Sequence, residues 1–179
     1  MIPARSVLVL GGARSGKSRY ALALAETAAP ERVMIATAQA FDDEMAGRIA
    51  RHKAERGAGW TTREAPLELA AALAEEARPG RVAVVDCLTL WLSNLLLAER
   101  DLEAATAELA ELALSGPVIF VSNEVGQGIV PQTPLGRAFR DAQGRANQAL
   151  AAVCDAVVVV TAGVPRLLKP APLPHIRLG

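Results

Sequence analysis

The segment from Gly11 to Ser18 reads GGARSGKS and fits the phosphate-binding pattern G-x-x-x-x-G-K-[ST]. An apolar run precedes it and a helical pattern begins at Lys17, so the loop is expected between a strand and a helix. Glycines let backbone N–H groups turn toward phosphate oxygens, and the helix N-terminus adds partial positive charge. We therefore predict that Lys17 contacts the β- and γ-phosphates of a nucleotide and that Ser18 ligates Mg²⁺. A merely structural glycine-rich turn would not require both residues.

A second chemical group follows another apolar run, in RVAVVDCLTLWL, where Asp86 directly ends a central strand pattern. Proteins with this type of phosphate loop need a carboxylate at a neighbouring strand end to hold the metal or its waters. The alternative is that Asp86 caps the helix that follows, because aspartate is favoured at that position. The metal role is favoured, and the two roles are compatible.

A helical pattern follows the second predicted strand and carries a ridge of cationic side chains. Arg48, His52 and Arg56 are spaced four residues apart, with Lys53 alongside, and this arrangement suits a phosphate group. Met45 lies at the helical spacing that puts His52 beside an apolar stripe. Taken alone, such a histidine is more often structural, and a solvated helix face remains an alternative.

The apolar runs predict the fold that would position these groups. Five short runs are typical of buried strands, and four alanine- and leucine-rich stretches between them have helical spacing. Alternating strands and helices indicate a mostly parallel α/β sheet covered by helices on both faces. Four prolines after Val164 predict an extended, non-helical tail from about residue 165. The predicted strands are 6–10, 32–38, 81–86, 117–122 and 155–162, and the predicted helices are 17–29, 66–77, 101–114 and 136–153.

Length and composition limit the class of protein. The chain has 179 residues, of which 51% are hydrophobic and 21% charged, and this predicts a single globular domain over 1–179. The formal net charge is zero, which argues against a general nucleic-acid binder. We expect no signal peptide and no membrane span, hence a cytoplasmic protein. Cys87 and Cys154 lie in apolar segments and are expected to be buried free thiols.

Four sequence blocks, in the same order along the chain, resemble one enzyme family. GGARSGKSRYA, ATAQAFDDEMAGRIARHK, VDCLTLWLSNLL and SNEVGQGIVPQTPLGRAFRDAQGRANQALA are similar to the bifunctional adenosylcobinamide kinase/adenosylcobinamide-phosphate guanylyltransferase family of cobalamin biosynthesis. The resemblance runs from residue 7 to about 169. It implies a RecA-like P-loop NTPase fold and a homotrimer. It also implies phosphorylation of adenosylcobinamide by ATP or GTP, followed by transfer of GMP from GTP to adenosylcobinamide phosphate.

The resemblance also implies the site residues. The family's histidine, which carries GMP covalently, falls in the block RIARHK, where His52 is the only histidine; the other histidine, His175, lies in the tail. Some relatives have glutamate where this chain has Asp86. The family's nucleotide contacts match Gly11, Gly12, Ala13, Arg14, Ser15, Gly16, Lys17, Ser18, Ala36, Thr37, Ala38, Lys53, Ala54, Glu55, Arg56, Glu64 and Asp86.

The block SNEVGQGIVP follows a strand, and its two glycines allow a ligand to approach the backbone closely. Asn123 and Glu124 are therefore interpreted as lining the cleft, with a structural loop as the alternative. No residue is assigned as the general base of the phosphorylation step.

Two other functions fit part of this pattern. A simple small-molecule kinase would use Lys17, Ser18 and Asp86 without His52. A non-catalytic nucleotide-dependent switch or RecA-like assembly module would bind nucleotide to act on a partner. Labelled GTP separates the three possibilities, because the label ends on the protein, on a small molecule or in free phosphate.

Overall fold

The computed structural model describes residues 3–39, 47, 57 and 59–171. Its elements follow one another as β1 (Ser6–Gly11), α1 (Lys17–Ala28), β2 (Glu31–Ala36), β3 (Trp60–Glu64), α3 (Leu69–Glu76), β4 (Arg81–Asp86), α4 (Leu88–Leu97), α5 (Leu102–Leu112), β5 (Val118–Asn123), the short 3₁₀ helix η1 (Val125–Gln127), α6 (Pro134–Val153), β6 (Ala156–Thr161) and β7 (Val164–Lys169). Within these residues the strands form one seven-stranded sheet in the order β3-β2-β4-β5-β1-β6-β7. Every pairing is parallel except that of β6 with β7.

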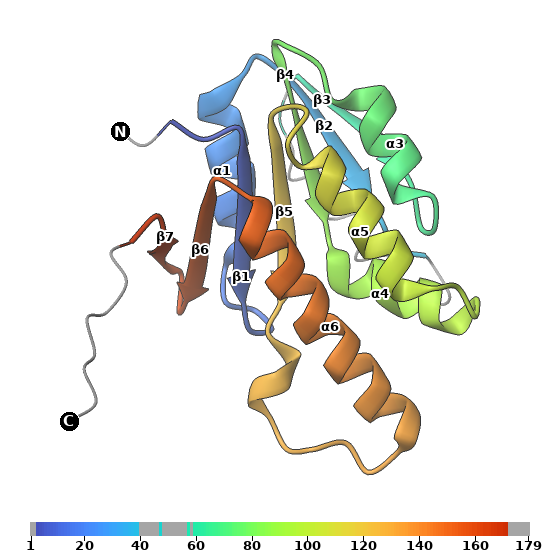
Figure 1. Ribbon diagram of the computed structural model, residues 1–179. Helices are drawn as coiled ribbons and strands as arrows, with labels where there is room; N and C mark the ends of the chain where they lie inside the picture. The colour runs from blue at the N-terminus through green and yellow to red at the C-terminus, as the bar shows by residue number, and fades with distance from the viewer. Residues whose placement is uncertain (1–2, 40–46, 48–56, 58, 172–179) are drawn as a thin grey trace, which may run out of the picture.

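Helices cover both faces of this sheet, as predicted (Figure 1). Helix α1 packs on one face through Ala21 and Ala25, against a layer of mostly valine side chains from the central strands. Helices α3, α4, α5 and α6 cover the other face, where Trp91 and Phe120 are the largest fully buried side chains. Because side chains alternate along a strand, both faces of each central strand are apolar, which explains the continuous apolar runs in the sequence.

All five predicted strands and all four predicted helices are present, with ends shifted by a few residues. Strand β3 was not predicted, because it lies at the sheet edge and its residues Thr61 to Glu64 are exposed, so they show no apolar alternation. The described part of the tail is extended as predicted and pairs with β6 as strand β7, whereas residues 172–179 lie outside the described residues. Pro165 is tolerated there because β7 is an edge strand. Among the described residues, no helix is long and apolar enough to cross a bilayer.

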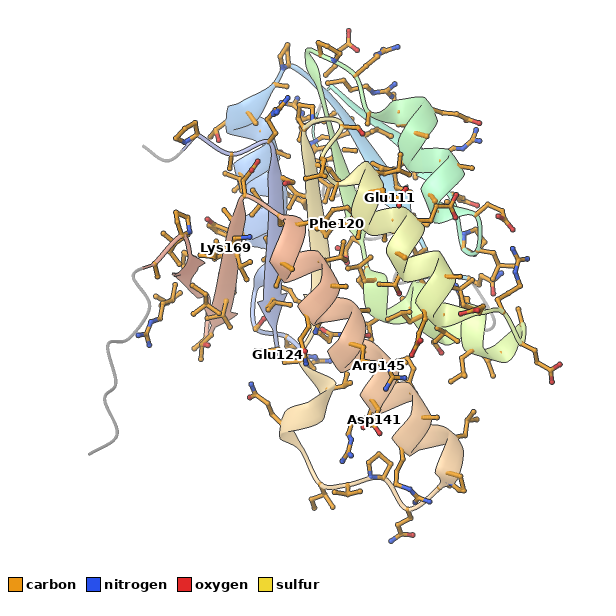
Figure 2. The ribbon with its side chains drawn as sticks, in the orientation of Figure 1. Glu111, Phe120, Glu124, Asp141, Arg145 and Lys169 are labelled. Atoms are coloured by element: carbon orange, nitrogen blue, oxygen red, sulfur yellow. The ribbon has the colours of Figure 1, made fainter. Side chains whose placement is uncertain are left out.

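Side-chain hydrogen bonds help to define the ends of two helices. Asp101 accepts hydrogen bonds from the backbone N–H groups of Glu103 and Ala104, at 3.0 Å each, and so caps α5. At the C-terminal end of α6, the Lys169 Nζ donates to the carbonyl oxygens of Ala151 and Ala152. Lys169 thus fastens β7 to α6, at the end of the sheet where β6 begins (Figure 2).

Asp155 fastens the start of β1 to the start of β6. Its carboxylate accepts hydrogen bonds from the backbone N–H of Arg5, at 2.7 Å, and of Ser6, at 3.1 Å. These two bonds, in that order, hold the pKa of Asp155 below its ordinary value. The ionised carboxylate therefore stabilises the pairing of β1 with β6 at the amino end of these strands, away from the phosphate loop.

We predict that Asp155→Asn lowers the Tm by about 2 °C at pH 7. A carboxylate with a lowered pKa in the folded state stabilises the fold above its unfolded pKa of about 3.9 and stops doing so as the pH falls through the folded value. The difference in Tm between wild type and Asp155→Asn should therefore vanish in acid. Calorimetry across pH measures it, with Glu111→Gln, which removes an exposed carboxylate of α5, as control. A difference that persists at pH 2 contradicts the prediction.

Candidate active site

The carboxyl ends of the parallel strands bring the predicted site residues to one edge of the sheet. The register pairs Gly11 with Asn123 and Ala36 with Asp86. Alternation along each strand puts these last residues on the same face as Val9, Val121, Val84 and Met34, which pack with α1. Asp86, Asn123 and Gly11 therefore all lie on the face where α1 begins.

The loop between β1 and α1 has a backbone conformation that requires glycine. Gly16, the residue before α1, has a left-handed conformation with φ 94°. No side chain caps the first backbone N–H groups of this helix. The Lys17 Nζ donates to the carbonyl oxygen of Gly12 at 3.2 Å, across the mouth of the loop. Lysine and N–H groups thus converge on one place, an arrangement that binds anions.

Two neighbouring segments brace this loop, and neither brace was predicted from the sequence. The N–H of Gly163, in the turn between β6 and β7, donates to the carbonyl oxygen of Ser15 at 2.8 Å, and the N–H of Glu124 donates to Gly11 at 3.3 Å. Gly163 has φ 82°, and Ala162 before it has φ 51°, which is typical of a tight hairpin turn. The Ala-Gly pair between two extended segments was the available sequence signal. The loop therefore depends on β5 and on the β6–β7 hairpin.

Asp86 and Lys17 are both close enough to Cys87 for their charges to act on its thiol. The negative charge of Asp86 and the positive charge of Lys17 both act on the Cys87 thiol, but burial dominates and raises its pKa to about 11. Helix α4 begins at Leu88 with Cys87 as its N-cap residue and no side-chain cap bond. The alternative in which Asp86 caps that helix is therefore wrong, since Asp86 precedes the capping position.

Both cysteines are buried and free, as predicted. Burial also raises the pKa of Cys154 to about 11. Burial thus favours the neutral thiol in both residues, the form that is a poor nucleophile.

Thr37 lies directly after β2 and ties that strand to α4. Its hydroxyl donates to the carbonyl oxygen of Cys87 at 2.7 Å and accepts from the Cys87 N–H at 2.9 Å. The Asn94 Nδ2 donates to the carbonyl oxygens of Thr37 and Pro66, at 2.8 and 3.0 Å. The side chain of Thr37 is fully buried and bonded within the protein. It holds the backbone beside Ala36 and Ala38, two positions that match nucleotide contacts of the family in the resemblance described above.

Glu64 ends the edge strand β3, opposite Ala36 of β2. Four interstrand steps separate β3 from β1, which is about 19 Å at about 4.8 Å per step. Glu64 and the phosphate loop therefore share one edge of the sheet but cannot contact the same phosphate group. His52, Lys53, Ala54, Glu55 and Arg56, together with Arg48, lie outside the residues that the structure describes.

The donors at this edge suit magnesium in particular. Among the described residues, no three His, Cys, Asp or Glu side chains form a metal-binding group. Mg²⁺ does not need one, because proteins usually hold it with one or two side-chain oxygens, substrate phosphates and water. The hydroxyl of Ser18, at the start of α1, and the carboxylate of Asp86 are donors of that kind.

A parallel sheet with this loop between β1 and α1 defines a P-loop NTPase fold. Solved structures agree: the ATPase EscN of the enteropathogenic E. coli type III secretion system matches with a TM-score of 0.57 and 11% identity, over 89% of this chain and 43% of that one. A protein from Pyrococcus horikoshii OT3 matches with a TM-score of 0.51 and 10% identity, over 92% of this chain and 86% of that chain. At these identities the likeness concerns the fold alone.

The chain belongs to the cobinamide kinase/cobinamide phosphate guanyltransferase family, whose model matches residues 7–168. It is 50% identical to the bifunctional adenosylcobalamin biosynthesis protein CobP of Pseudomonas aeruginosa, over 93% of this chain and 98% of that one. It is 42% identical to the CobU protein of Salmonella typhimurium, over 88% of this chain and 96% of the relative. The resemblance seen in the four sequence blocks is thus confirmed, and the chain is a member of an enzyme family.

The packing around Gly11 predicts an asymmetry between the two glycines that open the loop. A Cβ added at Gly11 would lie 2.6 Å from the carbonyl oxygen of Val160, whereas one added at Gly12 meets no atom within 4 Å. Gly11→Ala should therefore lower the free energy of unfolding of the ligand-free protein by about 1–3 kcal/mol. Gly12→Ala should change it by less than about 0.5 kcal/mol. Urea unfolding of both variants measures this, and equal losses would contradict the packing argument.

Proposed function

We propose that this chain catalyses two successive reactions of cobalamin biosynthesis at one nucleotide site. In the first, ATP or GTP phosphorylates the aminopropanol hydroxyl of adenosylcobinamide. In the second, GTP donates GMP to the resulting phosphate and yields adenosylcobinamide-GDP. The family match over residues 7–168 and the bifunctional relatives support the two activities. The observation that carries the single site is that the phosphate loop and Asp86 follow strands β1 and β4 at the same end of the sheet, with only β5 between them.

In the phosphorylation step, Lys17 and the N–H groups at the start of α1 would hold the β- and γ-phosphates. Ser18 and Asp86 would hold Mg²⁺, which neutralises phosphate charge when bound. The rest of the loop, from Gly11 to Gly16, would wrap the phosphates with its backbone. Asp86 has a shorter side chain than the glutamate of some relatives, so its oxygens reach less far from β4.

In the guanylyl transfer, we assign the nucleophile to His52. A neutral imidazole nitrogen would attack the α-phosphorus of GTP, forming an N–P bond as the bond to the β-phosphate breaks and pyrophosphate leaves. Arg48 and Arg56 would stabilise the charge that develops on the phosphate oxygens. The phosphate of the corrinoid then attacks the same phosphorus and releases the histidine. We further assign Ala36, Thr37, Ala38, Lys53, Ala54, Glu55, Arg56 and Glu64 to nucleotide contacts.

The family match favours this proposal over the two alternatives, a simple kinase and a nucleotide-dependent switch. The partners we propose are therefore small molecules, namely adenosylcobinamide, its phosphate, ATP and GTP, with neither nucleic acid nor membrane involved. A homotrimeric assembly and a cytoplasmic location complete the proposal.

If one loop serves both reactions, Lys17→Ala should lower both the phosphorylation of adenosylcobinamide and the labelling of the protein by α-labelled GTP, each by at least about 100-fold. The lysine supplies charge to the phosphates and little to the core, so the Tm should hold. Lys169→Ala is the matched control, because Lys169 lies at the opposite end of the sheet and its side chain donates to two carbonyl oxygens of α6. Undiminished self-labelling of Lys17→Ala would demonstrate a second nucleotide site.

The assignment of His52 predicts a split between the two activities. His52→Ala should abolish covalent labelling and guanylyl transfer while the γ-phosphate still reaches adenosylcobinamide, because that transfer uses Lys17 instead. The label should be acid-labile and alkali-stable, as a phosphoramidate is. Peptide mapping after reaction with α-labelled GTP locates it, with His175→Ala as the matched control. Label on His175 or on Lys53 would refute the assignment.

A further inference from the structure

A buried polar cluster lies behind the carboxyl end of β5, on the face covered by α6. The Gln143 Nε2 donates to the Ser122 Oγ at 2.8 Å and to the Asn147 Oδ1 at 3.1 Å, and the Ser122 hydroxyl donates to the same Asn147 oxygen at 2.6 Å. Ser122 and Gln143 are completely buried. Burying such groups in an otherwise aliphatic core gives up apolar packing. The cluster therefore has a role that apolar side chains cannot fill, which is to hold a backbone group by hydrogen bonds.

What the cluster fixes is the backbone of the next residue, Asn123. The Asn147 Nδ2 donates to the carbonyl oxygen of Asn123 at 3.0 Å. On the other side, the N–H of Asn123 donates to the Thr89 hydroxyl, near the start of α4, at 3.0 Å. Both backbone groups of Asn123 are thus held by side chains, one from α6 and one from α4.

In contrast to the backbone groups of Asn123, its side-chain oxygen accepts no hydrogen bond. Alternation along β5 turns it to the α1 face, away from the cluster. Its Oδ1 is buried and has no hydrogen-bond partner. The Gln143 Oε1 is buried and unpaired as well, so an unpaired oxygen does not by itself mark a ligand site. A phosphate oxygen only accepts hydrogen bonds, so Asn123 can meet one only through its Nδ2, which rotation about χ2 can present.

The position of Asn123 indicates which part of a ligand it meets. Strand β5 lies between β1, which leads into the phosphate loop, and β4, which ends at Asp86. Asn123 pairs with Gly11, and Asp86 pairs with Val121, so Asn123 extends two residues beyond the level of Asp86. Glu124, which follows Asn123, donates its N–H to Gly11 (labelled at the lower end of β5 in Figure 2). A terminal phosphate held by Lys17 and Ser18 would therefore lie beside the amide of Asn123.

We propose that Asn123 is a catalytic residue of the phosphorylation step, with Asn147 and Gln143 as its positioning residues; this rests on the proposed kinase function. The acceptor hydroxyl oxygen forms a bond to the γ-phosphorus and its proton is released to solvent. The bond to the β,γ-bridging oxygen breaks, and the nucleoside diphosphate leaves with the electron pair. The Asn123 Nδ2 donates a hydrogen bond to a non-bridging γ-oxygen throughout and stabilises the charge in transit. The guanylyl transfer, which takes place at the α-phosphorus, does not use this contact.

The test compares the two activities in Asn123→Ala and in Asn123→Leu, which has nearly the same volume, carries no charge and lacks the amide donor. Both should lower kcat for transfer of the γ-label to adenosylcobinamide by about 100-fold, with KM for the nucleotide changed by less than about threefold. Labelling of the protein by α-labelled GTP should stay within about threefold of wild type. Should Asn123→Ala fold poorly, the Leu variant alone decides, because it keeps the volume of the side chain without adding a charge.

Thr89→Val is the structural control, because it removes the acceptor of the Asn123 N–H and leaves the amide in place. It should lower the Tm and reduce both activities in the same proportion. An equal loss of both activities in the Asn123 variants, or wild-type phosphorylation in either, overturns the assignment. A wild-type chain that moves no γ-label to adenosylcobinamide refutes the proposed kinase itself, and with it this inference, whereas active wild type with active variants refutes the inference alone.

Discussion

The site depends on the register of parallel strands. Because β1, β5, β4 and β2 run in one direction, their carboxyl ends meet at a single edge, and the pairing of Gly11 with Asn123 and of Ala36 with Asp86 sets which residues meet there. A slip of one residue in any strand would turn its last side chain to the opposite face. The apolar layer under α1 opposes such a slip. A slip would move Val9, Val121 or Val84 out of the layer that packs against α1.

Buried hydrogen bonds then fix each strand end individually. Thr37 and Asn94 hold the end of β2 against α4, and Ser122 with Asn147 holds the end of β5 against α6. The N–H of Gly163 holds the phosphate loop from the far side. These hydrogen bonds lie within the protein, so the loop can keep an open, anion-binding backbone without relying on a ligand for its shape.

The sequence was informative wherever local chemistry or periodicity carried the signal. The central strands were predicted because both of their faces are buried, and the loop from Gly11 to Ser18 was predicted because glycine, lysine and serine are needed at fixed spacing. Strand β3 was missed because its exposed residues, Thr61 to Glu64, carry no apolar pattern. The capping alternative for Asp86 failed because helix α4 starts one residue later than that alternative required.

By itself, then, the sequence determined the strand–loop–helix unit, the parallel α/β architecture and the family, since each rests on residues close together in the chain or on matched blocks. Only the tertiary structure decided which strands are neighbours and hence that Asn123 lies between the loop and Asp86. It also decided that Thr37 is a clamp, that Gly163 braces Ser15, and that Gln143 and Asn147 hold β5 from α6. These relations join residues many positions apart, and their free energy comes from packing and buried hydrogen bonds that exist only once the chain has folded.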